Sequence, residues 1–409
     1  MTRRGAAAIG LIAAGAFLNV AVAVILGLLA FVVELVHSIW MRRGLTGVSY
    51  SRRLSVERIP WGEEIPMTIE VWNRKRLPLA WLQADDATSE GVIVRGRPIV
   101  ETEQTGLALR NTWTLAPFER VIRHVRLASD RRGVFSIGPV GLSVGDLCAR
   151  QAAAGERRGV DHFVVWPRTL PAVGMARPDR WGDVDRARRG LLDDPARFAG
   201  VRPYSPGDPL RKLHARTSAR LGVPITKRFE PSRERQVLLA LDLQTEPGPD
   251  WDISFGEESV EGLIVVAASI ALSLATERTA FGLTAAGYTR SPSRFADVPV
   301  AHAAGQVNRV LDVLARLSSH PSAPFEVLLA RIRRRIRPGA TIFVITSRAP
   351  SPFLAELRRL RRAGFDIAIL ACGPDAVADA ALARGAGFPA RAAALDGPWR
   401  SATRLVATG

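Results

Sequence analysis

The feature that most constrains this chain is an apolar run from Gly5 to Trp40, close to the N-terminus. As a single helix the run would extend ~50 Å, whereas the hydrocarbon core of a bilayer is only ~30 Å thick. A polar residue, Asn19, divides the run into a short first part and a longer second part. The run is too long for the apolar core of a secretory signal peptide, and it predicts membrane-spanning segments instead.

Arginine pairs flank this run at both ends, at Arg3–Arg4 and at Arg42–Arg43. Positive charge concentrates on the cytoplasmic side of membranes, and only a hairpin keeps both pairs on that side. We therefore expect a transmembrane hairpin over residues 1–43, a location in the cell membrane and cytoplasmic soluble domains. The alternative is one long tilted helix with the remaining chain outside the cell. The expected helices cover Ala6–Leu18 and Val20–Trp40.

The composition sets a few further limits on function. The 56 Lys+Arg residues exceed the 39 Asp+Glu residues and give a net charge of +17, which favours anionic partners or an anionic membrane surface. No basic patch is interleaved with aromatic residues, so we expect no nucleic-acid binding. Cys148 and Cys372 are far apart in the sequence, which argues against a disulfide framework and fits a reducing compartment.

Two soluble regions with different periodicity follow the apolar run. Residues 44–167 alternate apolar and polar side chains in short segments such as IPMTIEVWN, which predicts an antiparallel β-sandwich. Residues 235–409 instead alternate apolar strands such as QVLLALDL with helical segments such as SVEGLIVVAASIALSLATE. That order predicts a doubly wound α/β domain with a mostly parallel sheet.

A basic segment lies between these regions, in residues 168–234, which we interpret as a linker. Asp208 has the character of a helix N-cap, and Pro209 of a first helical residue, so we expect a helix from Pro209 to about Leu221. Its cationic face could rest on anionic lipid, dock an acidic partner, hold a phosphate, or simply be solvated. His214 and Ser218 lie four residues apart, but without an orienting acid they do not indicate a nucleophile and base.

The sequence DDPARFAGVRPYSPGDPLRKLHARTSARLGVPITKRFE closely resembles the signature of the domain-of-unknown-function 58 family. The resemblance extends in order over the paired apolar start, the β-rich region and the VVWPRTLPAV segment. It implies that the signature positions act in partner binding or in shaping this segment. The signature residues that we take as the candidate site are Arg202, Tyr204, Gly207, Asp208, Arg211, His214, Ser218 and Arg220.

The resemblance further implies a von Willebrand factor A-like α/β domain and a MoxR-type AAA+ ATPase as partner. Such A-domains bind Mg²⁺ through an Asp-x-Ser-x-Ser loop after the first strand, since hard cations need oxygen ligands. Here Asp242 is retained as a candidate metal ligand, but Gln244 and Glu246 replace the serines. Arg348 stands where an acidic residue would be expected, and a cation there would repel Mg²⁺. Possible substitute ligands are Asp250, Asp252, Glu257 and Glu258.

The combined interpretation is a membrane-anchored, non-enzymatic adaptor or scaffold for assembling or activating protein complexes. The sequence contains no GxGxxG after a strand, no GxxxxGK[ST], no GxSxG elbow at a strand-to-helix turn and no HExxH. The GxSxG string at Gly141–Gly145 lies within the β-rich region. We therefore expect no enzymatic activity and no cofactor other than a doubtful Mg²⁺. Two alternatives are an enzyme that uses the strand-end cleft of the α/β domain and an extracellular adhesion-type A-domain. The sequence does not identify the client protein.

Overall fold

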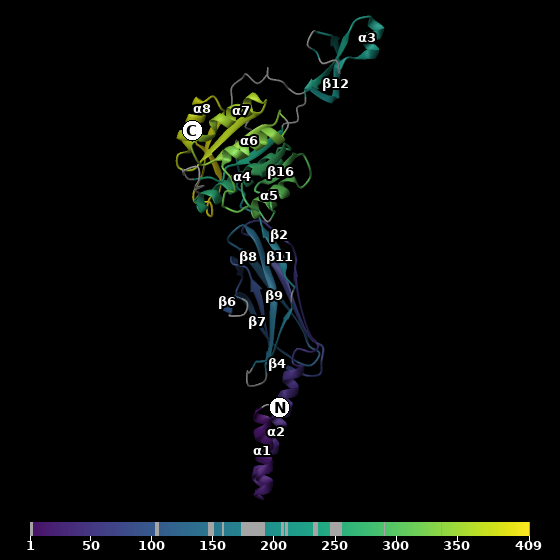
Figure 1. Cartoon of the computed structure of the whole chain (residues 1–409), viewed down its shortest axis with the longest axis vertical. Helices are drawn as coiled ribbons and strands as arrows, with labels where there is room; N and C mark the ends of the chain where they lie inside the picture. The colour runs from purple at the N-terminus through teal and green to yellow at the C-terminus, as the bar shows by residue number, and fades with distance from the viewer. Residues whose placement is uncertain are drawn as a thin grey trace. The chain divides into compact units, whose positions relative to one another are not determined.

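The computed structural model describes residues 3–102, 106–145, 151–157, 159–172, 193–205, 208, 212–231, 236–245, 256–289, 291–336 and 338–408. The chain divides into two compact units, Met1–Trp166 and Pro167–Gly409. Figure 1 shows the elements of each unit. The expectations for Gly207, Arg211, Asp250, Asp252 and Cys148 fall outside the described residues.

The first unit begins with two helices, α1 (Arg3–Phe17) and α2 (Ala21–Arg43), which confirms the expected helical pair. The helices run side by side in Figure 1 and pack antiparallel, with glycines at their points of closest approach. A Cβ atom on Gly27 would lie 2.7 Å from Cγ1 of Ile12, and one on Gly15 would lie 2.8 Å from Cβ of Ala23. Glycine at these two positions therefore lets the helix backbones approach closely.

Two β-sheets follow and share one hydrophobic core, so the expected strand-rich region is confirmed. Alternate residues of the strand Ile65–Asn73 are fully buried, which matches the alternation in its sequence. One sheet has the order β1 (Val48–Leu54), β3 (Ile65–Asn73), β8 (Arg120–Ser129) and β5 (Val92–Val94). The other has the order β2 (Arg58–Ile59), β11 (Asp161–Val165), β9 (Gly133–Gly145), β4 (Leu79–Thr88), β7 (Gly106–Leu115) and β6 (Ile99–Thr102), with β10 (Gln151–Arg157) paired to β9.

The second unit contains a small antiparallel pair and a seven-stranded mixed sheet. The pair consists of β12 (Asp193–Pro203) and β13 (Ile225–Pro231), with helix α3 (Ala215–Leu221) between them in sequence. The large sheet has the order β16 (Ala296–Ala301), β15 (Ala280–Ala285), β14 (Gln236–Leu241), β17 (Thr341–Thr346), β18 (Asp366–Cys372), β19 (Ala390–Leu395) and β20 (Leu405–Thr408). Its helices are α4 (Glu257–Thr276), α5 (Gln306–Arg316), α6 (Phe325–Arg335), the 3₁₀ turn η4 (Ser351–Phe353), α7 (Leu354–Arg362) and α8 (Ala376–Gly385).

The five central strands of the large sheet are parallel, and both edge strands are antiparallel. Apolar side chains of α6, α7 and α8 share one core with the sheet, while α4 contacts β14 and β15, and α5 contacts β15 and β16. The expected α/β region with a mostly parallel sheet is therefore confirmed. The antiparallel edge strands β16 and β20 did not emerge from the sequence pattern.

One helix of the described residues, α4, is long and apolar enough to cross a bilayer, but more than half of its most apolar stretch is buried within the protein. Its continuous apolar character is explained by burial between the sheet and α5, because a helix that is apolar all round needs cover on every side. Shorter apolar stretches lie in the N-terminal helices, at Gly5–Phe17 and Ala21–Val36. Their location in a membrane stays a prediction.

Lys75, in the turn between β3 and β4, closes the C-terminal end of α2. Its ammonium donates hydrogen bonds to the carbonyl oxygens of Arg43, at 2.8 Å, and of Gly44. A cation is favourable at a helix C-terminus, where carbonyl groups lack partners within the helix. Burial disfavours the charged form and lowers the pKa of Lys75 to about 8.

This lowered pKa predicts that Lys75 becomes a reactive free amine at unusually low pH. In the full-length protein, brief acylation between pH 6 and pH 11 followed by peptide mass spectrometry should give a half-maximal rate near pH 8 at Lys75. The control is Lys75→Arg, which keeps the positive charge but has no amine to acylate. The acylated peptide that is absent from this variant is the one that reports on Lys75. A rate that still rises tenfold per pH unit above pH 9 would show that the amine has an ordinary pKa.

Candidate functional site

The first candidate site lies at the carboxyl edge of the large sheet, between β14 and β17. Asp242 directly follows β14 and is fully buried, and Arg348 follows the end of β17 by two residues. From β14 the chain continues to β15 and β16 on one side of β14 in the sheet. It then returns to form β17 on the other side of β14. This reversal is the topological switch point, which is where open α/β sheets bind ligands.

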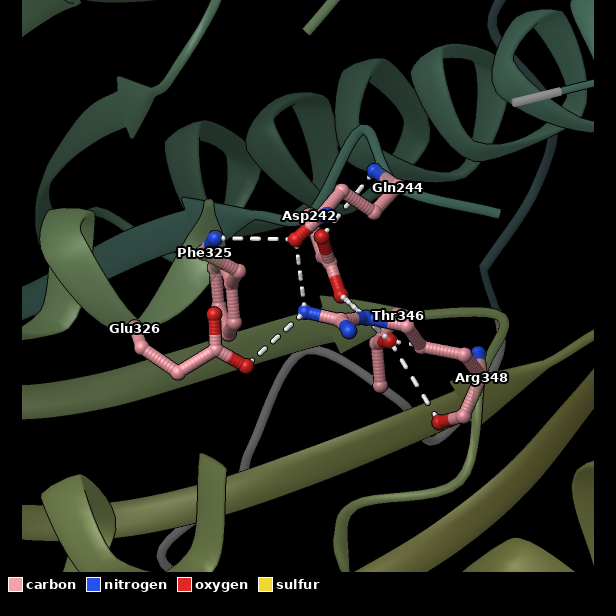
Figure 2. Close-up of polar contacts among 6 residues, drawn as sticks. All are labelled: Asp242, Gln244, Phe325, Glu326, Thr346 and Arg348. Atoms are coloured by element: carbon pink, nitrogen blue, oxygen red, sulfur yellow. Dashed lines mark hydrogen bonds and ion pairs between the residues drawn. The ribbon is translucent and has the colours of Figure 1, made fainter. Parts of the chain in front are cut away.

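Every oxygen of the Asp242 carboxylate accepts a hydrogen bond (Figure 2). Oδ2 accepts from Nε of Arg348 at 2.8 Å and from Oγ1 of Thr346 at 2.9 Å, while Oδ1 accepts from the backbone N–H of Gln244 at 3.1 Å. Burial raises the pKa of Asp242, and the Arg348 charge and these hydrogen bonds act in the opposite direction. The guanidinium thus compensates a carboxylate that water cannot solvate.

The Nη2 atom of Arg348 connects the ends of β14 and β17 to helix α6. Nη2 donates to Oε1 of Gln244 at 2.8 Å and lies 3.3 Å from Oε1 of Glu326. The same Gln244 oxygen accepts the backbone N–H of Phe325, the first residue of α6, at 3.0 Å. These contacts join β14, β17 and the N-terminus of α6 in one polar network (Figure 2).

The residues around Asp242 do not fit a divalent cation. Both oxygens of its carboxylate are occupied by N–H and O–H donors, and the cation that they face is a guanidinium. Of the possible substitute ligands, Glu258 instead accepts from Nε1 of Trp399 at 2.5 Å and pairs with Arg400 at 2.7 Å, and Glu257 is exposed. Among the described residues, no group of three or more His, Cys, Asp or Glu side chains could hold a metal ion.

The second candidate site is the signature segment, which we call the β12–α3–β13 module, comprising residues 193–231. Within the segment 168–234 that we interpreted as a linker, the described residues of β12 and β13 form an antiparallel strand pair in which Arg202 lies opposite Thr226. Arg202 donates to Oδ1 of Asp208 at 2.6 Å, and the backbone N–H of Ser205 donates to Oδ2 at 3.0 Å. The hydrogen bond from Arg202, followed by that from Ser205, lowers the pKa of Asp208.

The expected helix from Pro209 to Leu221 is shown over Ala215–Leu221, where α3 lies, but is interrupted at Leu213, and residues 209–211 lie outside the described residues. Leu213 forms an isolated antiparallel bridge with Thr226, so the backbone there follows β13 and cannot be helical. His214 is the N-cap in place of Asp208, and its Nδ1 accepts the backbone N–H of Thr217 at 3.2 Å. Gly222 ends the helix with φ of 69°, as a left-handed C-terminal glycine does.

His214 and Ser218 have structural contacts in this module. Oγ of Ser218 accepts the backbone N–H of Ile225 at 2.9 Å, and the backbone N–H of His214 donates to the carbonyl of Ile225 at 2.8 Å. Both residues therefore attach α3 to β13. Tyr204, half-buried, is joined to the same segment through its backbone N–H and the carbonyl of Pro224, at 2.9 Å.

One face of the module is exposed and carries positive charge next to apolar side chains. Arg216 and Arg220 are exposed on α3. Neither guanidinium has a hydrogen bond or ion pair with another described residue. Leu221 and Val223 are also exposed, at 58% and 52%, immediately after the helix. We call these four residues the α3 face.

The sequence pattern identified Asp242 and Arg348 but missed Thr346, Phe325 and Glu326 as their neighbours. Thr346 could have been found as the last residue of an apolar strand parallel to β14. Glu326 and the Phe325 amide belong to a helix whose position relative to β14 depends on tertiary packing. No local sequence signal places them beside Arg348.

Both candidate sites lie within one stretch that is shared with other proteins. Residues 200–371 match the family model described as "Protein of unknown function DUF58". This match begins within β12 and ends within β18, so it contains the exposed α3 face and the Asp242–Arg348 network. It agrees with the resemblance carried by the signature residues.

Among curated proteins, the chain is similar to "Uncharacterized protein YeaD" of Bacillus subtilis (strain 168), with 35% identity over 89 residues. The similar stretch covers 22% of this chain and 20% of that protein, so it spans about a fifth of the relative's length. Solved structures with partial similarity include a CARDB domain from Pyrococcus furiosus, at 11% identity and a TM-score of 0.19 over 29% of this chain and 84% of that one. Another is a cohesin module from Clostridium perfringens, at 9% identity and a TM-score of 0.21 over 29% and 97% of the two chains.

The Asp208 contacts predict a pH dependence of local order in the β12–α3–β13 module. A carboxyl with a folded pKa below its unfolded value, ~3.9, contributes stability above that value and loses it as the pH falls through the folded pKa. Asp208→Asn should therefore speed hydrogen exchange of the Ser205 amide severalfold at pH 7. At a pH below the folded pKa the two proteins should exchange alike. A variant that exchanges at the wild-type rate at pH 7 would contradict a stabilising role for Asp208.

Proposed function

We propose that this chain is a membrane-anchored, non-enzymatic adaptor that docks an acidic partner protein on its α3 face. The observation that carries the proposal is the exposure of Arg216 and Arg220 beside Leu221 and Val223. Charged groups arranged around exposed apolar side chains are typical of surfaces that bind proteins, where charge steers association and apolar contact supplies affinity. The resemblance to the domain-of-unknown-function 58 family suggests a MoxR-type AAA+ ATPase as the partner.

Other residues of the module support this role by holding the α3 face in place. His214, Ser218 and Gly222 fix both ends of α3 through their contacts, and Arg202 is paired with Asp208. The described signature residues thus attach α3 to β13, while Arg216 and Arg220 of α3 have no hydrogen bond or ion pair with another described residue. Because α3 is already held in place, binding a partner would cost less free energy for ordering side chains and loops.

The Asp242–Arg348 network supports an adaptor over an enzyme that uses the strand-end cleft. At the switch point, the polar groups of Asp242, Gln244 and Thr346 are engaged with one another and with Arg348. We propose that the α/β domain is of the von Willebrand factor A-like class, and its strand order and the position of Asp242 at the end of β14 support this proposal. In this proposal the α/β domain acts as a scaffold that binds other proteins and does not catalyse a reaction.

The N-terminal helices support the membrane anchor. Their outward side chains include Phe17, Val22, Ile25 and Leu29, which are between 59% and 90% exposed. An apolar surface of this kind is unfavourable in water and favourable in a lipid environment. At 1.5 Å per residue, the 23 residues of α2 extend ~34 Å, and the apolar stretch Ala21–Val36 within it extends ~24 Å, against a hydrocarbon core of ~30 Å. The arginines at both ends of the hairpin favour a cytoplasmic location for the soluble units.

The docking proposal predicts that reversing the α3 charges removes the partner. Full-length protein is captured from native membranes under nucleotide-trapping conditions, as wild type and as an Arg216→Glu, Arg220→Glu double variant. We expect an AAA+ ATPase to be recovered with the wild type and to fall at least tenfold with the variant, because two contacts become repulsive. The ATPase is quantified by mass spectrometry.

The matched control is an Arg333→Glu, Arg334→Glu variant, which reverses two exposed arginines of α6. This control changes net charge equally and should leave recovery unchanged. Equal losses in both variants would attribute the effect to net charge, and equal recovery in wild type and α3 variant would reject the α3 face as the docking surface. If the wild type recovers no AAA+ ATPase, the assignment of the partner is rejected.

A further inference from the structure

Arg348 occupies the point on which the oxygen atoms of the switch point converge. Its Nε and Nη2 atoms lie within 3.3 Å of carboxylate oxygens from Asp242 and Glu326 and of the amide oxygen of Gln244. The hydroxyl of Thr346 is bonded to the same Asp242 oxygen, Oδ2. Carboxylate, amide and hydroxyl oxygens are the ligands that a hard divalent cation takes.

The charges around this point also fit a cation. Asp242 and Glu326 supply two negative charges, and Arg348 supplies the one positive charge within the described network. The Arg348 side chain is 13% exposed and the Asp242 side chain 1%, so water compensates the carboxylate of Asp242 little. A buried carboxylate requires a positive partner, whether that partner is an ion from solution or a side chain of the protein.

We propose that Arg348 is a tethered cation that takes the place of a divalent metal ion at the switch point of this α/β domain. A guanidinium is always protonated and presents planar donors in a fixed fork, so it can satisfy several oxygens at once. Because it is covalently attached, its occupancy does not depend on ion concentration. The contacts among β14, β17 and α6 are then permanent, and this edge of the sheet is independent of divalent ions and of chelators.

Removing the guanidinium should therefore uncover a metal site. In Arg348→Ala, the oxygens of Asp242, Gln244 and Glu326 lose the guanidinium that they share, and the two carboxylates among them lose their positive partner. Mn²⁺ is a suitable probe because its free ion gives an electron paramagnetic resonance signal that decreases on binding. The experiment titrates MnCl₂ into the full-length protein in detergent, as wild type, as Arg348→Ala and as an Arg348→Ala, Asp242→Asn double variant.

We expect no saturable site in the wild type, one Mn²⁺ per chain in Arg348→Ala, and at least a tenfold loss of affinity in the double variant. At saturation, Mn²⁺ should raise the unfolding temperature of Arg348→Ala by about 5 °C and leave that of the wild type unchanged. The proposal is overturned by one saturable Mn²⁺ site per wild-type chain that disappears in the single variant Asp242→Asn, titrated in the same way. It is also overturned by a folded Arg348→Ala protein that binds no Mn²⁺.

A second measurement decides the case in which Arg348→Ala does not fold without metal. The variant is then refolded in the presence and in the absence of Mn²⁺, with Mg²⁺ as a second ion. Refolding that depends on the divalent ion supports the proposal, since the ion replaces the missing guanidinium. Failure to refold with either ion, together with a wild-type unfolding temperature that a chelator lowers, contradicts it.

Discussion

Arg348 neutralises a carboxylate that the fold places beyond the reach of water. The Asp242 side chain is 1% exposed at the end of β14, and the guanidinium reaches it from the loop after β17 with an Nε–Oδ2 distance of 2.8 Å. The same guanidinium contacts Gln244 and Glu326, and Gln244 in turn holds the first amide of α6. The junction of β14, β17 and α6 therefore depends on Arg348, because without it the Asp242 carboxylate would be left uncompensated in the interior.

Much of the fold could be predicted from periodicity. The alternation in IPMTIEVWN predicted β3, and the apolar runs QVLLALDL and DIAILAC predicted the central parallel strands β14 and β18. The break at Asn19 predicted the division between α1 and α2, and Asn19 has a positive φ of 55° there. These elements were accessible because burial on one face or on both leaves a direct record in the local sequence.

The parts that the sequence did not reveal depend on contacts between distant segments. The residues up to Leu213 carry a helix-start pattern, yet Leu213 pairs with Thr226 of β13 and delays α3 to Ala215. The sequence suggested that Arg348 would repel a metal ion but not that it would bind Asp242, because that contact joins residues 106 positions apart. Asp208 has the residue type of an N-cap, whereas its carboxylate binds Arg202 and the Ser205 amide.

The central claim, that Arg348 and Asp242 stabilise the α/β domain only as a pair, is tested most directly by a double-mutant cycle. Asp242→Asn, Arg348→Met and the double variant are compared with the wild type through hydrogen exchange of β14 and β17 amides in increasing urea. Arg348→Met leaves the buried Asp242 carboxylate without compensation and should cost ~3–5 kcal/mol of unfolding free energy, whereas Asp242→Asn leaves Arg348 with Glu326 as its carboxylate partner and should cost less. The double variant should be more stable than the sum of the single effects by at least ~2 kcal/mol, whereas effects that add to within ~0.5 kcal/mol would contradict the account.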